Sequence, residues 1–240
     1  MPGNAEIGVS FDDMHSYTDW GLRLKEVKIG IPEAKTVYVD VPGSDGSLDL
    51  TEAQNGGVKY GMRTLEFTFD ARNCSYQRWT NIISRIARDI EGKQKRIVID
   101  IDSGYYYTGR CHISTDKTNE VTAEIAIECN CDPYKLDITS SNEPWKWDTF
   151  NFVEGVIRNT SDIKINNTTG WQSVVLDGWD YNETLRIVSN AAMKVRYRNY
   201  IFEIAVGENI MYDIELFEGK NELFFQGSGT ITLIHRGGTL

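Results

Sequence analysis

The strongest constraint on the fold is a long segment in which apolar and polar side chains alternate residue by residue. Between Glu120 and Cys131 the apolar side chains fall on every second position, which is the period of a β-strand with one buried face. Strand-like segments of this kind recur through the first half, which is therefore predicted to be rich in β-structure. They are Leu22–Ile29, Thr36–Val41, Arg63–Asp70, Arg96–Asp102, Tyr105–Ser114 and Glu120–Cys131.

One segment of the first half has the period of a helix instead. Its apolar residues recur at spacings of three, one, three and four, which places them on one stripe of an amphipathic helix. Ser75 or Asn73 suits the helix start, and Gly92 suits a left-handed stop. We therefore predict a helix over Ser75–Glu91 that packs on the sheet. The stripe consists of Trp79, Ile82, Ile83, Ile86 and Ile90.

The second half begins where the alternation ends. The segment Ser140–Pro144 is polar and contains proline, as expected of a connector between domains. We predict a first domain over 1–132, a linker over 133–148 and an antiparallel β-sandwich over 149–240. Its strand candidates are Ile163–Asn166, Glu183–Val188, Lys194–Tyr197, Tyr200–Val206, Met211–Phe217, Asn221–Phe225 and Thr230–His235.

Charge and hydropathy exclude several classes of protein. The 240 residues include 25 Lys and Arg against 35 Asp and Glu, a formal net charge of −10, which argues against a basic nucleic-acid reader. No segment approaches the roughly 18 consecutive apolar residues of a membrane span. The first residues lack the basic and apolar regions of a signal peptide, so we expect synthesis and folding in the cytosol, without a membrane partner.

Sequence motifs of enzymes are missing. There is no dinucleotide-binding glycine pattern, phosphate loop, nucleophile elbow or zinc-protease motif, so neither catalysis nor a cofactor is predicted. The three histidines, His15, His112 and His235, form no motif with a nucleophile. Asp100 and Asp102 would share one strand face, about 6 to 7 Å apart, which keeps a glycosidase-like carboxylate pair as an alternative. Because Ile99 and Ile101 claim the core face, we expect these carboxylates to face water.

The cysteines are the one candidate for a metal site. Cys129 and Cys131 point to one strand face, and a neighbouring strand could bring Cys111 beside them. However, Cys111 and His112 would point to opposite faces of a regular strand. Buried, reduced thiols explain the pattern better, so no metal is predicted.

The tryptophans of the second half raise a binding function. Trp145, Trp147, Trp171 and Trp179 could stack on sugar rings if they are exposed, or they could fill the core of the sandwich. Trp171 and Trp179 each follow a glycine at a predicted loop, which makes them the candidates for sugar contact.

A turn motif stands between two strand-like segments of the first half. Pro42 presets its own φ, Gly43 and Gly46 permit positive φ, and Asp45 can bond nearby amides. We therefore predict a tight connection between two strands at this point.

The segment around this turn resembles a known family. It is similar to the N-terminal signature of the distal tail proteins, called Dit, of phages with long non-contractile tails. The resemblance extends to the opening of the chain and to the closing strands of the second domain. The matching segments are Pro32–Ala53, Val58–Tyr60, Arg63–Phe69, Ser10–Leu22, Phe217–Leu223 and Gly229–Leu233.

The resemblance implies a mainly β protein with one helix, made of a tail-tube-like split β-barrel or sheet domain and a galectin-like or carbohydrate-module-like sandwich. It implies a structural, non-enzymatic hub at the virion tail tip, a hexameric ring that joins the tail-tube protein to a tail-associated tip or lysin protein. An acidic channel in such a ring would let DNA pass without trapping it. The alternative is a carbohydrate-binding module for the wall polysaccharides of the host.

Overall fold

The computed structural model describes residues 7–53, 57–72, 75–117, 121–143 and 160–240. The chain divides into two compact units. The first comprises residues 1–102, 106–133 and 240, and the second comprises residues 103–105 and 134–239. The mainly β class with one helix, predicted from the sequence, is confirmed.

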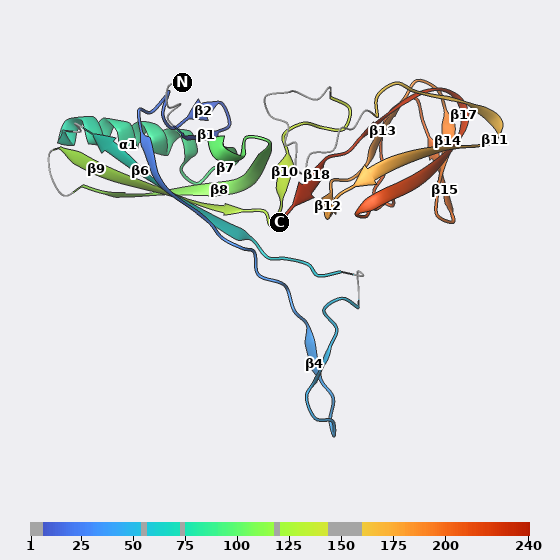
Figure 1. Ribbon diagram of the computed structural model, residues 1–240, viewed down its shortest axis with the longest axis horizontal. Helices are drawn as coiled ribbons and strands as arrows, with labels where there is room; N and C mark the ends of the chain where they lie inside the picture. The colour runs from blue at the N-terminus through green and yellow to red at the C-terminus, as the bar shows by residue number, and fades with distance from the viewer. Residues whose placement is uncertain (1–6, 54–56, 73–74, 118–120, 144–159) are drawn as a thin grey trace. The chain divides into compact units, whose positions relative to one another are not determined.

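The first unit is built on an antiparallel sheet with the strand order β2-β1-β7-β8-β9-β6-β3 (Figure 1). Its long strands β6 and β9 pair from Arg63 opposite Cys131 to Arg72 opposite Thr122. The strands are β1 (Val9–Phe11), β2 (Met14–His15), β3 (Arg23–Ile29), β6 (Arg63–Arg72), β7 (Gln94–Ile99), β8 (Tyr105–Asp116) and β9 (Thr122–Cys131).

The helix α1 (Tyr76–Ile90) lies against this sheet (Figure 1). Ser75 is its N-cap, and the Ser75 hydroxyl accepts a hydrogen bond from the amide of Arg78. Gly92, with φ of 65°, follows the last turn in the left-handed conformation that favours glycine. The predicted helix and its ends are therefore confirmed, apart from Asn73, which lies outside the described residues.

The core of the first unit lies on the face of the sheet where the predicted alternation put it. Phe67 and Phe69 of β6 and Ile125 and Ile127 of β9 are fully buried, and Phe11 of β1 packs edge-on against Phe67. Burying a side chain of this size stabilises the fold by about 1.5–3 kcal/mol. The helix closes this core with its own apolar stripe.

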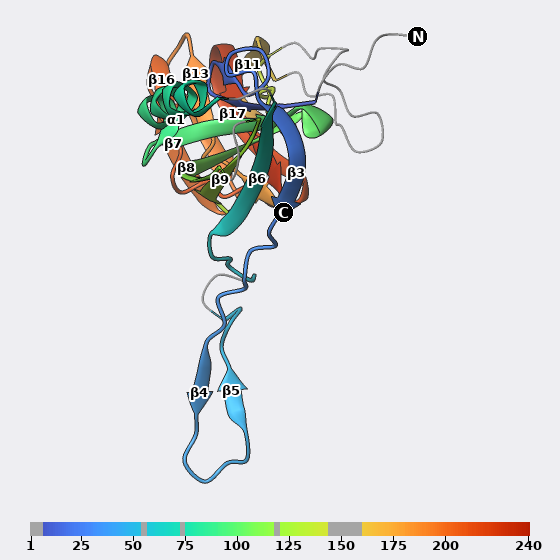
Figure 2. The same ribbon diagram turned by 90° about the vertical axis from the view of Figure 1, so that its left-hand side faces the viewer.

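Between β3 and β6 the chain forms a separate two-stranded ribbon, β4 (Tyr38–Asp40) paired with β5 (Ser47–Asp49). Figure 2 shows the two strands side by side at the end of two extended legs. We call residues 30–62 the hairpin arm. Every residue from 33 to 49 is exposed, so this part of the arm contributes nothing to the core of its own unit.

The second unit is also antiparallel. Its main sheet has the order β15-β14-β17-β13-β16, and β11 pairs with β17 along nearly its whole length. A small ribbon joins β12, β18 and β10. The strands are β10 (Lys135–Asp137), β11 (Ile163–Gly178), β12 (Tyr181–Asn182), β13 (Arg186–Ser189), β14 (Met193–Tyr197), β15 (Tyr200–Ile204), β16 (Gly207–Ile210), β17 (Gly219–Ile234) and β18 (Gly237–Thr239).

Strand β17 organises the core of the second unit. One part of it pairs with β14 and a later part pairs with β13, so the strand holds two portions of the sheet together. The buried side chains include Val195, Leu223, Phe225 and Leu233. The predicted strands Asn221–Phe225 and Thr230–His235 prove to be parts of this one strand.

The predicted strand Met211–Phe217 is wrong. No strand is assigned over these residues, although Met211, Ile214 and Leu216 are buried. The spacing of three and then two between them does not follow the period of a strand. The segment is an irregular loop whose apolar side chains pack into the core. A hydrogen bond from the Ile214 amide to the Met211 carbonyl stabilises its turn.

Candidate functional site

The hairpin arm is positioned by two legs that hydrogen-bond to each other. The amide of Gly61 donates to the carbonyl of Glu33, and the amide of Lys35 donates to the carbonyl of Lys59. Nearer the body, the amide of Gly30 donates to the carbonyl of Thr64 at 2.8 Å. These bonds carry the pairing from the sheet out to the ribbon and hold the two legs side by side.

The tip of the arm is the predicted turn. The amide of Ser44 donates to the carbonyl of Val41 at 3.1 Å, with Pro42 and Gly43 between them. Gly43 has φ of 84°, so the tip has proline and a positive-φ glycine at the positions that a type II turn favours. Gly46, with φ of 76°, turns the chain back into β5.

The ribbon of the arm is amphipathic, and its apolar face is uncovered. Because side chains alternate along a strand, Val37, Val39 and Val41 share one face, and Leu48 lies directly opposite Val39 on the partner strand. These four side chains keep relative exposures of 50%, 43%, 45% and 53%. No part of the described chain covers this face.

The other face of the ribbon is polar. Asp40 accepts a hydrogen bond from the hydroxyl of Ser47 at 2.6 Å, and Asp49 accepts one from the amide of Thr51 at 2.9 Å. The Thr51 bonds lower the pKa of Asp49, so this face is anionic at neutral pH. The arm as a whole carries five carboxylates against two lysines, namely Glu33, Asp40, Asp45, Asp49 and Glu52 against Lys35 and Lys59.

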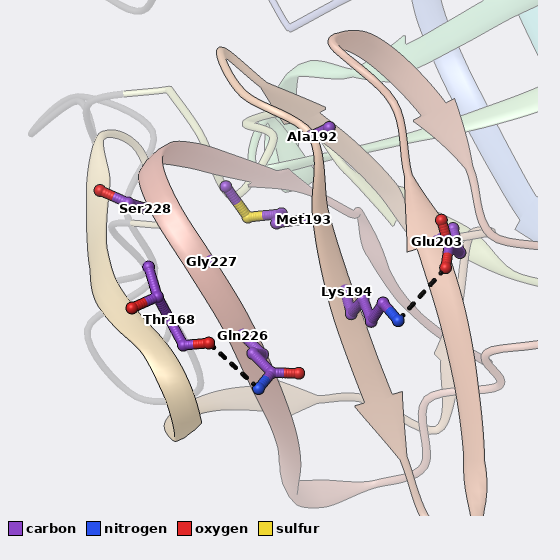
Figure 3. A pocket seen from close by; sticks show the side chains of 8 residues that line it. All are labelled: Thr168, Ala192, Met193, Lys194, Glu203, Gln226, Gly227 and Ser228. Atoms are coloured by element: carbon purple, nitrogen blue, oxygen red, sulfur yellow. Dashed lines mark hydrogen bonds and ion pairs between the residues drawn. The ribbon is translucent and has the colours of Figure 1, made fainter.

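A second surface feature lies on the outer face of the second unit. A shallow hollow of about 470 Å³ is lined in part by Lys194, Glu203 and Gln226 (Figure 3). Lys194 forms an ion pair with Glu203 at 3.4 Å, and the side-chain amide of Gln226 donates to the backbone carbonyl of Thr168 at 3.3 Å. The hollow therefore presents both donors and acceptors.

Trp171 lies on the same face as this hollow. The guanidinium of Arg196 stands over the Trp171 ring at 4.9 Å and over the Phe224 ring at 4.6 Å. Arg196 lies directly opposite Phe224 on the neighbouring strand. Two residues further along the same strands, Lys194 lies opposite Gln226, and both of these line the hollow. A residue two positions away shares its face, so the aromatic cluster and the hollow form one surface.

Trp179 has different surroundings. A Cβ atom added to Gly237 would meet the Trp179 ring at 2.0 Å, so this indole packs directly on the glycine of β18. The Trp179 amide and carbonyl also bond the Asn182 side chain at 2.9 and 2.7 Å. Sugar contact by Trp171 and Trp179 stays a prediction, while Trp145 and Trp147 lie outside the described residues.

Asp100 and Asp102 do not form the predicted pair on a strand face. The strand β7 ends at Ile99, and Asp100–Asp102 form a turn of 3₁₀ helix. Ile101 is consequently 64% exposed and does not claim the core face. Asp100 instead accepts a hydrogen bond from the amide of Gly8 at 2.7 Å and lies 3.1 Å from His15 Nε2, which is an anchor for the start of β1.

The remaining candidate residues are placed as follows. Cys111 is buried while its neighbour His112 is exposed and pairs with Glu91 at 3.2 Å. His235 is buried, and its backbone amide donates a hydrogen bond to the Ser141 hydroxyl at 3.0 Å.

Across the described ranges, no group of three or more His, Cys, Asp or Glu side chains is arranged to hold a metal ion. Among the same residues, no helix is long and apolar enough to cross a membrane.

Together these features define a class: a mainly β protein with a helix-backed antiparallel sheet, an exposed hairpin arm and a second antiparallel β unit. Comparison with solved structures makes this specific, because the chain is similar to the crystal structure of the Dit protein (gp 19.1) of phage SPP1. The TM-score is 0.59 at 10% sequence identity, over 98% of this chain and 99% of that chain. That protein is described as a paradigm of the hub of the adsorption apparatus in phages that infect Gram-positive bacteria.

The similarity shows that the chain has a Dit-like fold, as the resemblance in the sequence predicted. No protein-family model and no curated protein matches the chain. The sequence pattern predicts the hairpin arm only in part. The pattern predicts its first strand and its turn but not the uncovered apolar face. The sequence indication of that face is valine at every second position between segments that contain glycine and proline.

Proposed function

We propose that the protein is a structural subunit of a phage tail hub, which assembles into a ring of six copies between the tail tube and the baseplate or tip. Its work is done by surfaces and not by a reaction. The Dit-like fold supports the hub role, and the hairpin arm supports the assembly. The proposed partners are other copies of the chain, the tail-tube protein and a tip protein, and the proposed location is the virion tail tip.

The single observation that carries the proposal is the uncovered apolar face of the arm. A two-stranded hairpin without other support is marginally stable in water, and contiguous exposed apolar side chains mark interaction sites. Val39 and Leu48, at 43% and 53% exposure, are therefore expected to become buried on a partner. The partner we infer is the neighbouring copy in the ring.

In the proposed ring, each arm docks on the next copy at a surface remote from that copy's own arm, which makes a head-to-tail contact. Contacts of this kind generate a closed ring when the rotation between copies closes, whereas a two-fold dimer needs the same patch on both partners. The arm leaves its unit between β3 and β6, and β3 is an edge strand of the sheet. Edge strands are protected when a neighbour covers them, so ring closure would cover both the arm and this edge.

The charge of the protein fits a channel that DNA crosses. The net charge is −10, and the polar face of the arm carries Asp40 and Asp49. A wall of negative potential repels phosphates and so avoids retaining the nucleic acid. We therefore propose that the ring encloses an acidic channel.

The test compares the two faces of the ribbon. The double variant Val39→Ser, Leu48→Ser removes the apolar face, and the matched control Asp40→Ser, Asp49→Ser changes the polar face at neighbouring positions of the same strands. Light scattering over a concentration series, with and without the tail-tube protein, measures assembly. We expect the first variant to remain monomeric while the control assembles like the wild type. Equal assembly of wild type and the apolar-face variant would exclude the arm as the contact.

A second function is favoured by one observation on the second unit. We propose that the surface formed by Trp171, Phe224 and the adjoining hollow binds a sugar of the host cell wall. Aromatic rings can stack on sugar rings, and Lys194, Glu203 and Gln226 can bond hydroxyl groups. Six copies in a ring would raise the avidity of a weak site without new contacts. This function and the hub role can coexist.

A further inference from the structure

The three described cysteines lie on neighbouring strands in the buried core of the first unit. Cys111 of β8 and Cys129 and Cys131 of β9 are all fully buried. The Cys111 and Cys129 sulfurs are 3.0 Å apart, and the Cys129 thiol donates to the Cys111 sulfur. A disulfide bond is about 2.05 Å long, so both are free thiols in direct contact.

The position of this pair in the sheet is the one that suits a cross-link. Cys111 lies directly opposite Cys129. The Cys111 amide donates to the carbonyl of Lys93 at 3.1 Å, and the Cys111 carbonyl accepts from the amide of Gly92 at 2.8 Å. Both backbone groups therefore point away from β9, because the amide and carbonyl of one strand residue face the same side.

Cys111 and Cys129 are thus a non-hydrogen-bonded pair of an antiparallel ladder. In such pairs the Cα atoms are about 4.5 Å apart, which lies within the range of about 4.4–6.8 Å that a disulfide spans. Cys131 has no such partner, since it lies opposite Gly109. A Cβ atom at Gly109 would meet the Cys131 sulfur at 2.3 Å, so that space holds a single thiol.

We propose that Cys111 and Cys129 form a covalent modification site, at which a small peroxide oxidant produces an intrachain disulfide between β8 and β9. The inference does not depend on the proposed hub function. The bond would join two neighbouring strands that both contribute buried side chains to the core of the first unit. Neither backbone has to move far, because the strands already hold the two sulfurs in contact.

The reaction balances with hydrogen peroxide as the oxidant. One thiolate attacks a peroxide oxygen, the O–O bond breaks, and a sulfenic acid and hydroxide form; the hydroxide takes up the proton that the thiol released and becomes water. The second thiolate attacks the sulfenic sulfur, the S–S bond forms as the S–O bond breaks, and the leaving hydroxide takes up the proton of the second thiol to give water. Overall the two thiols lose two electrons and two protons, and one peroxide is reduced to two waters.

Burial determines the rate of this reaction. The hydrogen bond with the Cys111 thiol and burial raise the pKa of Cys129, and burial raises the pKa of Cys131 to about 12. The thiolate is the reactive form, so little is available at neutral pH and the reaction should speed up as the pH rises. Once formed, the disulfide would be shielded from thiol reductants while the sheet stays folded.

The experiment treats the full chain with hydrogen peroxide at about pH 9, where thiolates are more abundant, and alkylates the remaining thiols after unfolding. Digestion with trypsin places Cys111 in peptide 111–117, while Cys129 and Cys131 share peptide 118–135. We expect these two peptides to be joined, with fragmentation assigning the bond to Cys129. The unfolding midpoint of the oxidised protein should rise by about 5 °C, and a reductant should reverse the rise only after unfolding.

Substitutions identify the pair. Cys111→Ala or Cys129→Ala should abolish the link between these peptides, whereas Cys131→Ala and Cys74→Ala should keep it. Because a buried substitution can unfold the chain, the peptide map of the wild type serves as the independent readout. A bond that involves Cys74 or Cys131, or oxidation of Cys129 to a sulfinic acid without any cross-link, would overturn the proposal.

Discussion

Val39 lies directly opposite Leu48 in the ribbon of the hairpin arm, and about half of each side chain is exposed to solvent. Cross-strand apolar pairs normally pack against a core or a partner. Here the pair covers only itself, although the same chain buries aromatic and branched side chains completely on β6 and β9. In the proposed ring, a neighbouring copy would cover this pair.

The order of the arm should depend on the conformation of its tip. Gly43 has φ of 84° with no atom near the position of a Cβ, so Gly43→Val introduces backbone strain of about 1–2 kcal/mol and no clash. We expect faster hydrogen exchange in β4 and β5 and weaker ring assembly, with an unchanged unfolding midpoint. Ser44→Val adds the same side chain at the next residue, which has no positive φ. If both variants exchange alike, strain at Gly43 is not the cause.

The stability of the first unit should depend on Phe67. This side chain is fully buried and contacts Phe11 and Phe69, with ring centroids 6.0 and 6.4 Å away. Phe67→Ala should lower the free energy of unfolding by about 3–5 kcal/mol, because it leaves a cavity in a packed core. Leu48→Ala in the arm is the matched control and should cost less than about 0.5 kcal/mol. Urea titration followed by fluorescence measures both, and similar losses would refute this account of the core.

Acid should weaken the first unit in part through Asp12. Burial alone would raise the pKa of Asp12, but hydrogen bonds from Lys95 at 2.8 Å and from the Arg96 amide at 2.9 Å outweigh it and hold the pKa below its ordinary 3.8. Ionised Asp12 therefore stabilises the fold above that value, and the contribution is lost as the pH falls through the lowered pKa.

Asp12→Asn tests this linkage. Because Asp12 is 44% exposed, we expect a loss of only about 0.5 kcal/mol at pH 7, which shrinks toward about pH 3. Asp13→Asn is the control: it removes one negative charge at the next residue but leaves the hydrogen bonds of Asp12 in place, so it measures the effect of the charge alone on the free energy of unfolding. Unfolding titrations at both pH values give the difference, and a constant loss for Asp12→Asn would contradict the assignment.

Local signals predicted much of this fold. The helix over Ser75–Glu91 was predicted within one residue at each end, because the apolar stripe, the Ser75 cap and the Gly92 stop all agree. The buried face of β9 followed from its strict alternation. Such segments carry their periodicity, their ends and their burial in neighbouring residues, so tertiary contacts have little to change.

Other features depend on contacts that the local pattern does not contain. Asp100 was expected on a strand but lies in a turn of 3₁₀ helix. Its side chain accepts a hydrogen bond from the amide of Gly8, which is 92 residues away in the sequence. The contact between Cys111 and Cys129 required the register of β8 on β9. The uncovered face of the arm was missed because alternation predicts an apolar face but not what covers it.

Sugar binding by the second unit should depend on Trp171. Trp171→Ala removes the ring beside Arg196, and the double variant Trp171→Ala, Trp179→Ala removes both candidate rings. We expect the single variant to weaken binding to wall polysaccharide about tenfold, the effect of losing one stacking contact of about 1–1.5 kcal/mol. Trp179→Ala alone is the comparison, because that ring packs on Gly237. Unchanged binding by the folded double variant, or no binding by the wild type, would exclude this site.

The central claim is that six copies close into a ring through the hairpin arm. Negative-stain electron microscopy of the purified protein mixed with the tail-tube protein tests this most directly, since mass action and the adjoining ring both favour assembly there. The account predicts rings with six-fold symmetry that disappear when Val39 and Leu48 are replaced by serine. A two-fold dimer that persists at every concentration, with or without the tube protein, would contradict it.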